Sequence, residues 1–158
     1  TGSLFDAKFR GSDCILHNTT FNGRYAFNAL FAKEWNFKNG FSFNLGGKFT
    51  TVGGRWRGEV NRERSAEDLE VIFNLDDTYN TIQFASYLRL DGKVSLRWNR
   101  KNVTHELAID LVNVTGRENP LSLIYVPNHP VDPVQQNNQL GFLPLFYYKL
   151  DFFAGGNN

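Results

Sequence analysis

The sequence has 158 residues, a net charge of +1 and 15% aromatic residues, which indicates one domain and excludes a protein with a strongly basic nucleic-acid-binding surface. Its single cysteine excludes an internal disulfide framework, and no apolar run approaches the roughly 18 residues of a membrane helix. The combination of 15 Phe and 14 Gly with few Pro is typical of antiparallel β-structure.

In the first third of the chain, apolar and polar residues alternate with the period of two that predicts β-strands. We expect strands at 1–9, 24–35 and 41–53. The polar segment 10–23 is predicted to be a long loop, whereas 36–40 reads NFKNG and predicts a tight hairpin, because Asn-Gly is a strong turn signal. Gly46 and Gly47 permit a bulge or a close approach in the third strand.

The first strand begins without a preceding turn residue, and the sequence contains neither Met nor a signal peptide. We interpret the chain as mature, cleaved or an incomplete piece of a longer protein.

The remainder of the chain continues the same alternation between strands and connections. Residues 54–83 form a long polar stretch, in which 65–73 is a candidate for a short helix. A long loop at 115–138 holds four of the five prolines. The predicted strands are 85–99, 106–114 and 139–152, and a short turn at 100–104 joins the first two.

Short turns and long loops therefore alternate strictly along the predicted meander, which is typical of outer-membrane β-barrels. Trp35, Phe41 and Trp98 fall near the short turns, where an aromatic girdle is expected, although aromatic ends of a soluble core would give the same pattern. About six strands cannot close a membrane barrel, and an open edge cannot sit in lipid. The membrane interpretation consequently requires a segment of a larger barrel.

Five stretches carry a resemblance to a known family. They are GSLFDAKFRGSD at 2–13, NTTFNGRYAFNALFAKEW at 18–35, TYNTIQFASYLRLDGKVSLRWNRK at 78–101, VTHELAIDLVNVTGRENP at 103–120 and QLGFLPLFYYKLDF at 139–152. In this order they resemble the C-terminal end of TonB-dependent outer-membrane receptors of the Bacteroidetes type, the class that often carries a carboxypeptidase-regulatory-like domain.

The resemblance implies a fold and a function. Residues 1–152 would be the C-terminal part of a barrel of about 22 strands in the outer membrane of a Gram-negative bacterium, for energy-coupled uptake of a scarce solute. The TonB complex would act through an N-terminal plug, which this sequence lacks. Further implied partners are membrane lipid, the outer-membrane insertion machinery and a surface lipoprotein. Residues 153–158 form a short polar tail where the family usually stops.

Three groups of candidate site residues follow. The charged residues of the fourth strand are expected to face the lumen and pair with the plug, the aromatic residues of the long loops to contact the ligand, and the last strand to carry the assembly signal. The lumen-facing candidates are Arg89, Asp91, Lys93 and Arg97; the loop candidates are Trp56, Tyr79 and Tyr125; the assembly signal is Phe146, Tyr148, Leu150 and Phe152. The simpler alternatives are a solvated strand face and aromatics that pack their own loops.

No catalytic constellation, cofactor motif or metal-ligand spacing occurs, so we predict a protein that is not an enzyme and holds no metal. Candidates considered and set aside are His17, His105, His129, Cys14 and the adjacent pair Asp76 and Asp77, all interpreted as solvated or loop residues. Two further functions stay open: a small soluble β-barrel that binds a ligand in its interior, and a small membrane barrel of about eight strands. The sequence names no substrate.

Overall fold

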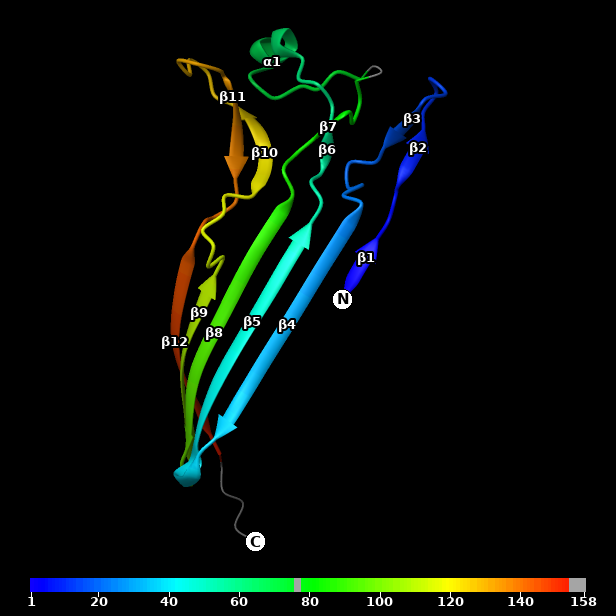
Figure 1. The fold of residues 1–158 in the computed structure, drawn as a ribbon. Helices are drawn as coiled ribbons and strands as arrows, with labels where there is room; N and C mark the ends of the chain where they lie inside the picture. Colours follow the sequence, from blue (N-terminus) through cyan, green and yellow to red (C-terminus); the bar gives the residue numbers. More distant parts are fainter. Residues whose placement is uncertain (76–77, 154–158) are drawn as a thin grey trace. The chain divides into compact units, whose positions relative to one another are not determined.

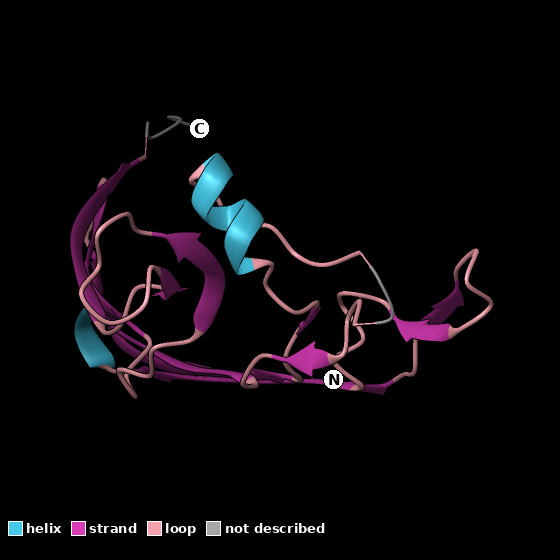
Figure 2. Cartoon of the chain, turned by 90° about the horizontal axis from the view of Figure 1, so that it is seen from above, coloured by secondary structure: helices cyan, strands magenta, loops and turns pink. Residues whose placement is uncertain are grey.

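The computed structural model describes residues 1–75 and 78–153. Strands account for 55% of the described residues and helix for 7%, which confirms the all-β prediction. In Figure 2 the helical segments, drawn in cyan, are confined within the described residues to the seven-residue helix α1 (Arg62–Asp68) and the 3-10 turn η1 (Lys38–Gly40). No helix in this part of the chain is both long and apolar enough to cross a membrane.

A six-stranded antiparallel sheet contains the long strands, as predicted (Figure 1). Its order is β1-β4-β5-β8-β9-β12. The strands are β1 (Gly2–Leu4), β4 (Tyr25–Asn36), β5 (Phe41–Val52), β8 (Tyr87–Asn99), β9 (Val103–Val112) and β12 (Leu143–Phe152). Each strand lies beside the next long strand along the chain, which is the order of a meander.

The chain divides into two compact units that are described separately. Unit 1 comprises 1–27, 50–88 and 118–140, and therefore holds the three long connections. Unit 2 comprises 28–49, 89–117 and 141–158, and holds both short turns. Loop length thus differs between the units, as the alternation in the sequence predicts.

In unit 2, the strand register separates two sheet faces of opposite chemistry. Val94 lies opposite Ile109, which lies opposite Phe146, whereas the neighbouring position Ser95 lies opposite Ala108. Successive side chains of a strand point to opposite faces. We define the apolar face as Val94, Leu96 and Trp98 of β8, Leu107, Ile109 and Leu111 of β9, and Phe146, Tyr148, Leu150 and Phe152 of β12; the polar face is Arg89, Asp91, Lys93, Ser95 and Arg97 of β8, Glu106, Ala108 and Asp110 of β9, and Tyr147, Lys149 and Asp151 of β12.

In unit 1, the connections predicted as long loops contain, among the described residues, three two-stranded antiparallel sheets and a helix. The strand pairs are β2 (Lys8–Arg10) with β3 (Leu16–Asn18), β6 (Trp56–Arg57) with β7 (Ile82–Gln83), and β10 (Pro120–Tyr125) with β11 (Val134–Asn138). The helix begins earlier than the predicted 65–73, because the Asn61 side chain accepts a hydrogen bond from the Arg64 amide at 3.0 Å and caps the first turn.

The prediction of one strand over 1–9 is wrong, because the chain leaves the main sheet after Leu4. The buried side chain of Asn22 explains the break: its Oδ1 accepts a hydrogen bond from the Ala7 amide at 2.9 Å, and its Nδ2 donates to Asp6 at 2.8 Å. A side chain thereby replaces the strand partner of this segment, and β2 pairs within its own hairpin.

Several further boundaries differ from the predictions. The last strand begins at Leu143 rather than Gln139, because the Gln139 amide donates to the Asn119 carbonyl at 2.8 Å and extends the β10–β11 hairpin. The strand β9 begins at Val103, so the turn before it is shorter than 100–104. β8 begins at Tyr87 rather than at residue 85.

Candidate functional site

Unit 1 contains a cavity of about 480 Å³ between two of the long connections. The first connection lines the cavity with residues 55–58, 69–71, Phe73, Tyr79, Asn80 and Phe84, and Leu121–Tyr125 of β10 form the wall from the second. Thr20, which precedes β4, adds one further lining residue. Trp56, Tyr79 and Tyr125, the three loop aromatics predicted from the sequence, all line this cavity. The structure therefore brings these three residues together in one place.

Trp56 and Tyr79 are held by contacts with the surrounding chain. The Trp56 indole N–H donates to the Asn22 carbonyl at 2.7 Å, and the guanidinium of Arg24 lies 5.6 Å from the indole centroid. The Tyr79 ring packs edge-on against Phe9 and His17, at centroid distances of 6.0 and 6.1 Å. These contacts fix the orientation of both aromatic side chains before any ligand is present.

Arg55 and Arg57 also line the cavity, on either side of the short strand residue Trp56. Their guanidinium groups lie 5.9 and 5.4 Å from the centroid of Phe84, so both positive charges are held against one aromatic ring. Burial lowers the pKa of Arg57, because it partly desolvates the charged guanidinium.

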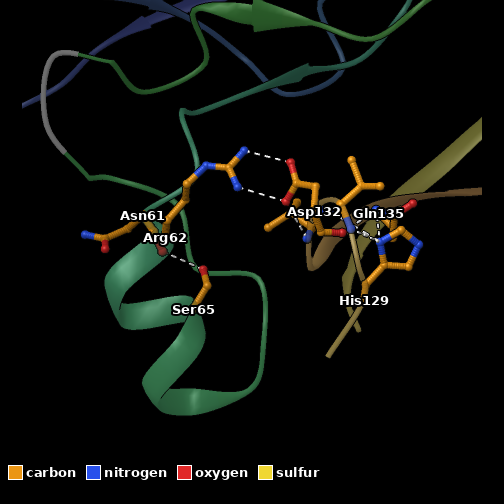
Figure 3. Close-up of polar contacts among 8 residues, drawn as sticks. Asn61, Arg62, Ser65, His129, Asp132 and Gln135 are labelled. Carbon is orange, nitrogen blue, oxygen red and sulfur yellow. Dashed lines mark hydrogen bonds and ion pairs between the residues drawn. The ribbon is translucent and has the colours of Figure 1, made fainter. Parts of the chain in front are cut away.

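An ion pair outside the cavity lining links the same two connections (Figure 3). Arg62, the first residue of α1, donates from Nη1 to Asp132 Oδ1 at 2.8 Å and from Nη2 to Oδ2 at 2.9 Å. Asp132 lies between β10 and β11, where it also accepts a hydrogen bond from the Val134 amide. We call this bidentate pair the Arg62–Asp132 clasp. Its hydrogen bonds lower the pKa of Asp132 to about 2.

The four lumen-facing candidates lie together on the polar face of unit 2. Each is in an ion pair: Arg89 with Asp91 at 2.6 Å, Lys93 with Asp110 at 3.7 Å, and Arg97 with Glu106 at 3.2 Å. The Lys93 ammonium also donates to the Tyr147 hydroxyl at 2.5 Å. The charges of this face are thus largely compensated within the sheet, and a lumen-facing role stays a prediction.

The four assembly-signal residues occupy alternate positions of β12 on the apolar face, and all four are exposed. Beside them, the Trp98 and His105 rings stack at 4.9 Å with an interplanar angle of 7°, and Phe41 stacks on Trp98 at 6.1 Å. Tyr148 completes this cluster, with its hydroxyl 2.6 Å from His105 Nδ1. The predicted girdle residues Phe41 and Trp98 are therefore in contact, whereas Trp35 packs on Phe43.

The remaining candidates are dispersed. His17 Nε2 lies 2.6 Å from Asp13 in the β2–β3 hairpin, and Cys14 is an exposed free thiol in the same hairpin. His129 lies between β10 and β11. Within residues 1–75 and 78–153, no three His, Cys, Asp or Glu side chains are grouped to hold a metal ion. Asp76 and Asp77 lie outside the described residues.

Sequence reasoning missed the two arginines and the β10 wall. The alternation of RWR at 55–57 and of LSLIY at 121–125 was the available signal. Comparison of the chain with protein-family models, curated proteins and solved structures found no match in any of the three.

Proposed function

We propose that this chain is a wall segment, with its outer loops, of a TonB-dependent receptor that imports a scarce solute across the outer membrane. Unit 2 would cross the bilayer, and the cavity of unit 1 would bind the solute. A plug upstream of these residues would couple transport to the TonB complex. Membrane lipid, the insertion machinery and a surface lipoprotein are the further partners that this proposal includes.

The observation that carries the proposal is the inverted distribution of side chains in unit 2. Phe146 and Phe152 on the apolar face are 71% and 76% exposed, whereas polar Ser95 and Glu106 on the opposite face are buried. Among the described residues, Ala108 is the one buried hydrophobic side chain of the chain. A soluble sheet of this size would cover its apolar face with a core, whereas a membrane barrel exposes that face to lipid.

Two features of unit 2 agree with this interpretation. The polar face carries ion pairs and hydroxyl groups, as expected of a barrel interior. The cluster of Phe41, Trp98, His105 and Tyr148 adjoins the short turns, where amphipathic aromatic rings favour a membrane interface. β1 and β12 stand at the two ends of the strand order, so closure needs additional strands.

A soluble ligand-binding module is the alternative. The cavity agrees equally well with a membrane receptor and with a soluble module, because aromatic walls with a few polar groups are typical of small-molecule sites in both classes of protein. The exposed apolar face of unit 2 separates the two functions, since it would make a soluble module prone to association.

Adjacent positions on β12 provide a matched test. Leu145 and Phe146 are both exposed apolar residues, but Leu145 lies opposite Asp110 on the polar side of the sheet and Phe146 on the apolar face. In the native polypeptide in lipid bilayers, we expect Phe146→Arg to lower the free energy of unfolding by about 2–4 kcal/mol and Leu145→Arg to change it by less than about 1 kcal/mol.

The intact mass of the native polypeptide provides a second test beside the two arginine substitutions. Detergent extraction from membranes should yield a polypeptide several times heavier than the 18.1 kDa of this chain. Equal effects of the two arginine substitutions, or recovery of an 18.1 kDa species without detergent, would contradict the proposal and favour the soluble module.

A further inference from the structure

Two cations in the cavity wall lack an acidic partner among the residues that the structure describes. Six other Lys and Arg side chains form ion pairs within the described residues, among them Arg62 with Asp132 and Arg97 with Glu106. Arg55 and Arg57 form no ion pair in the described chain, although the carboxylate of Glu70 also lines the cavity. Their positive charge is therefore available to a ligand.

Within the described part of the chain, the hydrogen bonds of these arginines occupy only some of their N–H donors. Arg55 Nη2 donates to the Leu121 carbonyl, and Arg57 Nη1 donates to the Gly58 carbonyl at 3.1 Å. The Nε–H of Arg57 is buried and has no hydrogen-bond partner among the described residues. A buried donor without an acceptor costs free energy, which a bound acceptor recovers.

The rest of the lining is mainly apolar or aromatic. Phe73, Leu121, Leu123 and Tyr125 line the cavity together with Tyr79, whereas Glu70 is the one carboxylate among the described residues that line it. Two guanidinium groups beside such a wall match a ligand with an anionic group and an apolar body, because a guanidinium binds carboxylate and phosphate through paired N–H donors.

We propose that the cavity binds a small organic anion whose carboxylate or phosphate pairs with Arg55 and Arg57 and whose apolar body lies against Tyr79 and Tyr125. This inference rests on the proposed function for its role as the site of an imported solute. Binding itself depends only on unit 1, which contains every lining residue that the structure describes.

Three indole probes test the charge requirement in the native polypeptide. Indole-3-acetate and indoxyl phosphate are anions, and indole-3-acetamide is the neutral match of the first. By titration calorimetry, we expect at least one anion to bind about 10-fold or more tightly than the amide. Arg55→Gln and Arg57→Gln should abolish that difference, whereas Arg64→Gln, an exposed position of α1 outside the lining, should preserve it.

Two additional variants separate lost charge from lost folding. Arg57→Lys keeps a positive charge and should retain part of the anion preference, and Tyr125→Ala should weaken all three probes without changing their ratio. Circular dichroism establishes that each variant is folded. The inference is overturned if the amide binds as tightly as both anions, if the preference survives Arg55→Gln and Arg57→Gln, or if no probe binds at concentrations up to roughly 10 mM.

The outcomes for the inference and for the proposed function are distinguishable. A detergent-free polypeptide that still prefers the anions would overturn the receptor and retain the anion site. A membrane-embedded polypeptide without any anion preference would overturn the anion site alone.

Discussion

Arg62 and Asp132 form a bidentate ion pair between two chain segments that are far apart in the sequence. Both Nη atoms of the guanidinium donate to the carboxylate, at 2.8 and 2.9 Å. The pair joins the start of α1 to the segment between β10 and β11, and these two connections also supply the walls of the cavity. The contact therefore fixes one wall of the candidate site relative to the other within unit 1.

Loss of the clasp is expected to loosen both connections without unfolding the sheet. Arg62→Gln removes the guanidinium group and with it both hydrogen bonds to the Asp132 carboxylate. The backbone amides of α1 and of residues 126–133 should therefore exchange hydrogen faster. Hydrogen-exchange mass spectrometry measures this change. Arg64→Gln is the control on the same helix, and equal exchange in the two variants would show that the clasp does not hold these segments.

Acid should open the clasp at unusually low pH. Arg62 and the Val134 amide lower the pKa of Asp132 from 3.8 to about 2, with a smaller contribution from the charge of His129. Because the folded pKa is below the unfolded value, the clasp contributes its full stabilisation above pH 3.8 and loses it as the pH falls toward 2. NMR titration of the Asp132 carboxyl group measures this midpoint.

The Arg62→Gln variant provides the control for the acid transition. Without the guanidinium, the midpoint for Asp132 should rise toward its ordinary 3.8. An unchanged midpoint would mean that the Val134 amide and other neighbours determine the titration.

Two adjacent glycines of β5 should respond differently to alanine. A Cβ at Gly47 would lie 2.2 Å from the Phe31 ring, whereas a Cβ at Gly46 would meet its nearest atom at 3.7 Å. We expect Gly47→Ala to lower the free energy of unfolding by about 1 kcal/mol, because the ring has to move away, and Gly46→Ala to have little effect. Denaturant titration in detergent measures both.

Removal of the ring should eliminate this difference. In a Phe31→Ala background, Gly47→Ala should cost no more than Gly46→Ala. A cost that persists in this background would indicate that the glycine backbone itself, rather than the ring, is the constraint.

The buried side chain of Asn119 should be essential for the start of β8. Its Oδ1 accepts from the Leu88 amide and its Nδ2 donates to the Leu88 carbonyl, both at 2.9 Å, and the residue is 2% exposed. Asn119→Ala leaves both backbone groups unpaired, so we expect a loss of about 2 kcal/mol or more in the free energy of unfolding.

Two variants check the Asn119 assignment by denaturant titration. Asn119→Asp retains an acceptor for the Leu88 amide but cannot donate to its carbonyl, so it should also destabilise the fold. Asn138→Ala removes an exposed side-chain hydrogen bond to Glu118 and should have a much smaller effect. Similar losses for Asn119→Ala and Asn138→Ala would contradict the proposed role.

The sequence predicted the elements whose pattern is strictly periodic. β5 and β8 carry long alternations of apolar and polar residues, and their positions follow from that period. β6 and β7 have two residues each and leave no periodic signal, and the break after Leu4 depends on Asn22, which lies far along the chain. Such tertiary hydrogen bonds are invisible to a local pattern.

The candidate site was predictable only by residue type. Trp56, Tyr79 and Tyr125 stood out as aromatics in polar loops, and the structure places them around one cavity. The importance of Arg55 and Arg57 depends on the absence of an acidic partner among the described residues, and pairing is decided by the fold. Asn80, which donates to the Asn18 carbonyl at 2.7 Å, also lines the cavity without any sequence signal.

None of the described residues that line the cavity belongs to the six-stranded sheet. Substitutions, insertions or deletions in 55–84 or 121–125 can therefore change the size and charge of the cavity while every register in the sheet stays the same. The described chain is consequently divided into a sheet with a fixed strand register and a candidate site whose residues can change independently of that register. Grafting both connections together onto another sheet of this kind should transfer ligand preference, whereas grafting one alone should transfer only half of the wall.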